Sequence, residues 1–181
     1  MPLPLGHATL GLVAYEATRD KTSAPRWWVV GFTVAVLANL PDIDVVIGLI
    51  CKANGWAFHR GPTHSLAFSL ICGLAASWAC RTLPGLPRLH LRTCILIIQS
   101  HIIADLVQGG PVSVFWPFQL QWAGGHIGWS GVLGSVVFEV FNDFKLIIAA
   151  GLVAVSIRII RQPPESLRPI ARVLFPSRDS S

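Results

Sequence analysis

Long apolar runs separated by short polar connections dominate this chain of 181 residues. Runs of this kind are typical of membrane helices, although several fall short of the roughly 20 residues that span a bilayer core comfortably. A shorter apolar piece at 131–141 favours a re-entrant or interfacial helix. The pattern therefore predicts an all-α integral membrane bundle of four to five transmembrane helices. The main runs cover residues 5–17, 27–50 with a proline at position 41, 63–80, 94–107 and 145–160.

The composition supports the same class of protein. Hydrophobic residues make up 52% of the chain and charged residues 13%, against about 25% charged residues in average soluble proteins. No basic stretch precedes the first apolar run, so we expect a retained first segment and not a cleaved signal peptide. The four cysteines form no CxxC pair, and we expect them to pack as small apolar residues.

Most basic residues gather in three stretches: between the first and second runs, between the third and fourth runs, and at the end of the last run and beyond it. If each run crosses the membrane once, these stretches lie on one side, which the positive-inside rule assigns to the cytoplasm. No aromatic residues interleave with them, so nucleic acid is not expected as a partner despite the net charge of +5. We divide the chain into a membrane domain, 1–161, and a flexible basic cytoplasmic tail, 162–181. The basic residues on this side are Arg19, Lys21, Arg26, Arg81, Arg88, Arg92, Arg158, Arg161, Arg168, Arg172 and Arg178.

The same topology places seven potential metal ligands together at the non-cytoplasmic ends of four apolar runs. Chance scattering would put about half of them on each side. Charged residues at membrane depth are costly, and they indicate a functional site by default. The seven residues are His7, Asp42, Asp44, His59, His64, His101 and Asp105.

Local spacing fits ligand duty at this face. His101 and Asp105 are four residues apart, so both project from one side of a helix. Asp42 and Asp44 are two residues apart, which diverges on a helix, but Pro41 favours an extended or broken backbone there. A proline at position 62 is suited to open the third helix, with one histidine approaching from the loop and the next from the first helical turn.

Four imidazoles and three carboxylates exceed what one closed tetrahedral site needs, so we expect one or two divalent metal ions. The imidazole-rich set favours zinc. The surplus suits two metal ions, or one metal ion plus a general base, for which Asp42 and Asp44 are the candidates. Arg60 would either balance an anionic group such as a phosphoryl group or extend its charge to the membrane interface. Ser65 and Thr63 are expected either to cap the third helix, which is the favoured role, or to hydrogen-bond the candidate ligands.

Three sequence blocks resemble those of the YdjM family, small bacterial and archaeal inner-membrane proteins described as membrane-bound metal-dependent hydrolases. The blocks are LPDID at 40–44, HRGPTHS at 59–65 and HIIAD at 101–105, followed by WPF at 116–118. His7 matches the family's N-terminal histidine, although Gly6 stands where the family usually has threonine. The resemblance covers roughly residues 1–120, and it implies an inner-membrane location, a divalent metal and hydrolase activity.

A position at the membrane interface favours a lipid or another small amphiphilic ester as substrate, with membrane lipids as partners. Two other classes of function remain open. A proton- or ion-coupled transporter would need polar residues leading to the cytoplasmic side, where the runs offer little beyond Glu16 and Ser77. A non-enzymatic, metal-stabilised membrane scaffold would need a closed site without an open coordination position.

Overall fold

The computed structural model describes residues 4–19, 26–138 and 144–162. These residues form seven α-helices, two short 3-10 turns and no strand, so the predicted all-α class is confirmed. Lys21 and the predicted tail beyond Gln162 lie outside the described residues. The helices are α1 (Pro4–Thr18), α2 (Trp27–Ala38), α3 (Ile43–Lys52), α4 (Leu66–Thr82), α5 (Leu91–Val107), α6 (Trp129–Val137) and α8 (Phe144–Arg161), and the 3-10 turns are η1 (Leu40–Asp42) and η2 (Pro62–His64).

The second apolar run is broken where Pro41 predicted a break. Its two halves, Trp27–Ala38 and Leu40–Lys52, meet at an angle of 51° and are together long and apolar enough to cross a bilayer. Within the described part of the chain, no single helix reaches that length and apolarity alone. The break takes the form of the 3-10 turn η1, because proline has no N–H to continue the α2 hydrogen-bond pattern.

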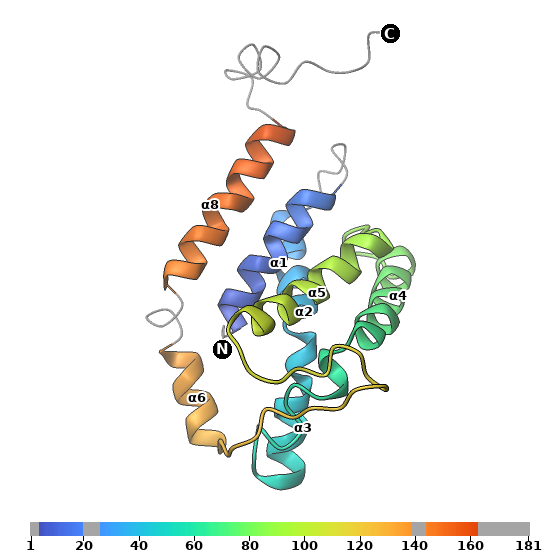
Figure 1. The fold of residues 1–181 in the computed structure, drawn as a ribbon. Coiled ribbons are helices and arrows are strands. Elements are labelled where there is room, and N and C mark those ends of the chain that lie inside the picture. Colours follow the sequence, from blue (N-terminus) through green and yellow to red (C-terminus); the bar gives the residue numbers. More distant parts are fainter. Residues whose placement is uncertain (1–3, 20–25, 139–143, 163–181) are drawn as a thin grey trace.

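Helix α1 is central to the packing and lies against α2, α5 and α8, while α4 packs on α5 (Figure 1). Glycine allows two of these close approaches. A Cβ on Gly11 would lie 2.8 Å from the Cβ of Ala38, and one on Gly73 would lie 2.5 Å from Cγ1 of Ile95. Small residues at helix contacts are typical of membrane bundles, in which van der Waals packing drives association.

The third apolar run begins as a helix later than its first residue predicts. The η2 turn contains His64, and α4 starts only at Leu66, so the expectation that this histidine lies in the first turn of the helix is wrong. Ser65 is the N-cap, and its Oγ accepts a hydrogen bond from the backbone N–H of Phe68 at 3.0 Å, as predicted. Thr63 does not cap the helix; its hydroxyl donates to Asp44 Oδ2 at 2.5 Å.

Residues 108–128, the segment that connects α5 to α6, contain no helix or strand. This connecting segment passes over the loop between α3 and α4 and is tied to it by backbone hydrogen bonds (Figure 1). Ser113 N–H donates to the carbonyl of Arg60 at 2.9 Å, and Ala123 N–H donates to the carbonyl of His59 at 3.0 Å. The segment therefore holds two residues of the HRGPTHS block in place.

Candidate metal centre

The structure gathers all seven residues that the sequence predicted at one face. They form three overlapping triads, and within each triad the candidate ligand atoms lie within 4.8 Å of one another. Six of the seven are buried, and only Asp42 keeps a partly exposed side chain, at 21%. The triads are His7, His101 and Asp105; Asp42, His64 and His101; and Asp44, His59 and His64.

Four side chains form the tightest part of the cluster. His64 Nε2 lies 3.2 Å from His101 Nε2 and 3.4 Å from Asp105 Oδ2. Asp42 Oδ1 lies 3.3 Å from His101 Nε2 and 3.6 Å from His64 Nε2. Two ligand atoms bound to one tetrahedral zinc ion at 2.0–2.1 Å lie about 3.3 Å apart. The spacing of Asp42 Oδ1, His64 Nε2 and His101 Nε2, which are 3.2–3.6 Å apart, therefore fits a single divalent ion.

Hydrogen bonds to the other ring nitrogens orient the two histidines. His101 Nδ1 lies 2.7 Å from the carbonyl oxygen of Ala38. A carbonyl can only accept, so Nδ1 carries the proton and Nε2 presents its lone pair to the cluster. His64 Nδ1 faces Asp44 Oδ2 at 3.1 Å in the same way. Such contacts fix the tautomer and ring orientation of metal-binding histidines in proteins.

Asp44 lies behind His59 and His64 and contacts the ring nitrogen Nδ1 of each. Its Oδ1 lies 3.1 Å from His59 Nδ1, and its Oδ2 accepts from Thr63 and faces His64. Both carboxylate oxygens thus contact protein partners, and the side chain is buried. Asp44 is placed to orient the two imidazoles, whereas Asp42 is placed toward their ring nitrogens and the exterior.

Several buried atoms of the cluster make no hydrogen bond, and this tests whether a metal ion fits. Among the described residues, buried nitrogen or oxygen atoms without a hydrogen bond include both ring nitrogens of His7, Nε2 of His59, Oδ1 of Asp42 and Oδ1 of Asp105. Buried polar atoms in proteins are normally hydrogen-bonded, and an exception calls for an ion or water. Lone pairs from imidazole and carboxylate are the donors that divalent metals take, so the residues fit the group that the family resemblance implies.

His7 and His101 stack face to face, with ring centroids 3.6 Å apart and planes inclined by 15°. Helix α1 brings His7 alongside α5, and its Nε2 lies 3.9 Å from Asp105 Oδ1. The side chain is fully buried. His7 therefore forms the triad with His101 and Asp105, on the α1 side of the cluster. Its position at the same face as the other six residues agrees with the predicted topology.

Charge at the centre is balanced by one arginine. Arg60 is 5% exposed, and its Nε lies 3.2 Å from Asp105 Oδ2 while its Nη1 donates to the carbonyl of Gly109 at 2.7 Å. Three carboxylates surround the His64 ring, with oxygens of Asp44, Asp105 and Asp42 at 3.1, 3.4 and 3.6 Å from its nitrogens. The carboxylates therefore favour a positive charge at the position of His64 Nε2.

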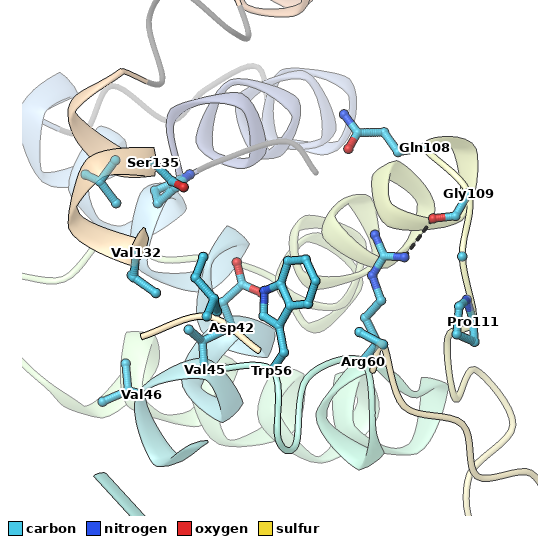
Figure 2. A pocket seen from close by; sticks show the side chains of 15 residues that line it. Asp42, Val45, Val46, Trp56, Arg60, Gln108, Gly109, Pro111, Val132 and Ser135 are labelled. Atoms are coloured by element: carbon cyan, nitrogen blue, oxygen red, sulfur yellow. Dashed lines mark hydrogen bonds between the residues drawn. The ribbon is translucent and has the colours of Figure 1, made fainter. Parts of the chain in front are cut away.

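A cavity of about 600 Å³ opens beside the cluster, and we call it the metal-side cavity (Figure 2). Asp42 is the member of the seven-residue cluster that lines it, and Arg60 lines it from the adjacent loop. The remaining wall is largely apolar and comes from α3, α6 and the loops between α3 and α4 and between α5 and α6. Its apolar and aromatic side chains are those of Val45, Val46, Trp56, Ile127, Val132 and Val136.

Sequence reasoning missed two residues that hold the loops of the site. Asn54 Oδ1 accepts from the backbone N–H groups of Trp56 and Ile127, and its Nδ2 donates to the carbonyl of Gly125. Ser113, fully buried, donates to the carbonyl of Gln121 and accepts from its N–H, both at 2.7 Å. The Asn-Gly pair at 54–55 signals a turn, but nothing in the local sequence indicates its partners 71 and 73 residues away.

An all-α fold with a buried histidine and aspartate cluster at one end, suited to a divalent metal, defines the class of this protein. The chain belongs to the YdjM inner membrane protein family, whose family model matches residues 1–163. The match confirms the resemblance seen in the three motifs and extends it beyond residue 120 through α8. No curated protein and no solved structure matches the chain significantly.

Proposed function

We propose that this chain is a metal-dependent hydrolase of the inner membrane that acts on an amphiphilic phosphoester. One observation carries the proposal: the facing ligand atoms of Asp42, His64 and His101 lie 3.2–3.6 Å apart, and Asp42 lines the metal-side cavity. A cavity of about 600 Å³ is in the range of small-molecule sites. A cluster of potential metal ligands next to such a cavity is suited to metal-dependent hydrolysis of a bound substrate.

When bound, a divalent ion supplies a water molecule whose pKa falls towards about 7 and a positive charge that polarises the scissile bond. Asp42 belongs to the cluster and also lines the cavity, so its carboxylate would both help to hold the ion and accept the proton of the attacking water. Asp44 keeps His64 oriented through its Nδ1. Arg60 holds Asp105 through Nε, and its Nη2 binds the anionic group of the substrate.

Zinc is the ion that the donor set favours, because nitrogen donors from histidine dominate it. His64, His101 and Asp42 would hold the first ion, with Asp105 beside them. The ring nitrogens of His7, Nε2 of His59 and Oδ1 of Asp105 make no hydrogen bond and are the candidate ligands for a second ion.

The membrane arrangement that we propose has four to five spans with the cluster at the non-cytoplasmic end. Two arginines link α8 to the opposite end of α1. Arg161 of α8 donates to the carbonyl oxygens of Glu16 and Arg19 at 3.0 and 2.7 Å, and Arg19 forms an ion pair with the Glu16 carboxylate. Arginines gathered at this end support a cytoplasmic position for it, by the positive-inside rule.

The core between the two ends favours a hydrolase over a proton- or ion-coupled transporter. Val34, Ile97 and Ile98 are fully buried there and belong to one hydrophobic cluster. These three aliphatic side chains cannot relay a proton or bind an ion. A purely structural metal site is disfavoured because Asp42 lines the metal-side cavity and thus leaves the cluster open to a substrate.

Metal analysis of the detergent-purified protein tests this function. We expect about one or two zinc ions per chain, and loss of metal in the His64→Ala, Asp105→Ala double variant. His126→Ala is the matched control, since His126 is exposed and lies outside the three triads. Equal, negligible metal in the unaltered protein and the double variant would overturn the metal centre.

Activity is tested separately on the zinc-loaded protein. We expect hydrolysis of a soluble phosphodiester such as bis(p-nitrophenyl) phosphate and of phospholipid in mixed micelles, and no hydrolysis by the double variant. Tightly bound metal without any hydrolysis of phosphoesters would favour the scaffold.

A further inference from the structure

A second hollow, of about 590 Å³, runs between α1 and α5 and is closed on one side by Leu146 of α8. Its wall is almost entirely aliphatic, with Leu10 and Val13 on α1 and Leu96 and Ile103 on α5. We call it the α1–α5 groove. It lies outside the metal cluster, because none of the seven clustered residues lines it.

The groove presents no free hydroxyl groups even though two hydroxyl residues line it. Thr18 Oγ1 donates to the carbonyl of Ala14 at 2.7 Å, and Ser100 Oγ donates to the carbonyl of Ile97 at 2.7 Å. Both hydroxyls are thus satisfied within their own helices. A peptide or a sugar in this groove would leave its own polar groups unpaired, at a cost of several kcal/mol each. The occupant that fits is a hydrocarbon chain.

The dimensions fit a chain and not a compact molecule. Along α1 the lining residues run from Leu10 to Thr18, and along α5 from Leu96 to Val107. At 1.5 Å per helical residue these stretches are about 12 and about 16 Å long. An elongated aliphatic groove of this length, parallel to membrane helices, matches an acyl chain.

Gln108 connects the groove to the metal-side cavity, since it lines both. It stands at the C-terminal end of α5, less than one turn beyond Asp105, and Figure 2 shows it beside Gly109 and Arg60 at the edge of the cavity. The metal-side cavity and the apolar groove therefore share one lining residue, Gln108. This shared residue distinguishes the groove from lipid-facing surface elsewhere on the bundle.

We propose that the α1–α5 groove binds an acyl chain of a phospholipid whose phosphate lies in the metal-side cavity. The inference rests on the proposed function for the role of the phosphate. The aliphatic wall of the groove indicates the substrate class, a membrane lipid rather than a water-soluble phosphoester. Gln108 positions the glycerol region between the two chambers.

Photocrosslinking tests where the chain lies, without any need for catalysis. The full-length protein is reconstituted into phosphatidylethanolamine vesicles that contain phosphatidylglycerol with a diazirine at the middle of one acyl chain. Peptide mapping should place the label on the groove faces of α1 and α5. Leu96→Trp and Val13→Phe, which fill the groove, should lower this labelling at least fivefold.

Ala75→Phe is the matched control, because Ala75 is exposed on α4 and does not line the groove. It should leave the labelling of α1 and α5 unchanged. Label spread evenly over exposed residues of α4 such as Leu70 and Ile71, or groove labelling that Leu96→Trp and Val13→Phe do not reduce, would show ordinary boundary lipid and overturn the proposal.

A rate ratio then separates this inference from the proposed activity. Leu96→Trp should lower the ratio of long-chain phospholipid to bis(p-nitrophenyl) phosphate hydrolysis at least tenfold, and an unchanged ratio would overturn the role of the groove in substrate choice. If the unaltered protein hydrolyses neither compound while crosslinking is confined to the groove, the lipid site stands and the proposed hydrolase function fails.

Discussion

The Nε2 atoms of His64 and His101 face each other at 3.2 Å, although 37 residues separate them along the chain. Their Nδ1 atoms point to Asp44 and to the carbonyl of Ala38. In that orientation two neutral rings would place two lone pairs against each other, which is unfavourable without a proton or a cation between them. The short distance between the two Nε2 atoms therefore indicates that a proton or a metal cation belongs between them.

Asp44→Asn should weaken metal binding by about 10- to 100-fold, the usual effect of losing a carboxylate that orients a metal-binding histidine. The amide replaces one acceptor with a donor, so it can no longer hold both His59 and His64 through their ring N–H groups. Competition with a chelator of known zinc affinity measures the change. Thr63→Val removes one contact to the same carboxylate and should give a smaller effect. Unchanged affinity in Asp44→Asn would refute the orienting role.

Metal affinity should rise with pH through the near-neutral range, with release of protons on binding. His64 must be neutral to bind a metal ion, whereas the carboxylates of Asp42, Asp44 and Asp105, 3.1–3.6 Å from its ring nitrogens, stabilise its protonated form in the metal-free protein. The ion must displace that proton, which becomes easier as the pH increases. Calorimetry in buffers of different ionisation enthalpy counts the protons released. A pH-independent affinity with no proton release would contradict the geometry around His64.

Ser113→Ala should destabilise the protein by about 1–3 kcal/mol, because the partly buried N–H and carbonyl groups of Gln121 both lose the Ser113 hydroxyl as their partner. Ser113 also donates its backbone N–H to Arg60, so loosening this point should increase hydrogen exchange in the segment 108–128. Thermal unfolding in detergent measures the first effect. Ser130→Ala, at an exposed position of α6, is the control and should leave the unfolding temperature unchanged.

Gly73→Leu should disrupt the contact between α4 and α5, since even a Cβ at this position would lie 2.5 Å from Ile95 Cγ1. We expect a loss of about 1–3 kcal/mol, the usual cost of overpacking. Gly151→Ala is the matched control, because a Cβ there meets nothing within 4 Å and alanine favours the helix. Equal stability of the two variants would show that α4 and α5 do not pack as closely as described.

Much of the site follows from local pattern. The i, i+4 spacing of His101 and Asp105 places both on one face of α5. The distribution of basic residues predicts the topology, and that topology places the seven polar residues at one end of the bundle. The break at Pro41 was equally predictable, because proline interrupts helical hydrogen bonding whatever surrounds it.

The sequence by itself therefore determined the class of protein, the all-α fold and the membership of the cluster, since these depend on helical periodicity and on the cost of charge near hydrocarbon. Only the tertiary structure decided that Asp42 faces the metal-side cavity while Asp44 orients His59 and His64. It also decided that Ser113 and Asn54 anchor the loops and that a groove meets the cavity at Gln108. These relationships join residues up to about a hundred positions apart, and contacts at that separation are set by how helices pack and not by any local period.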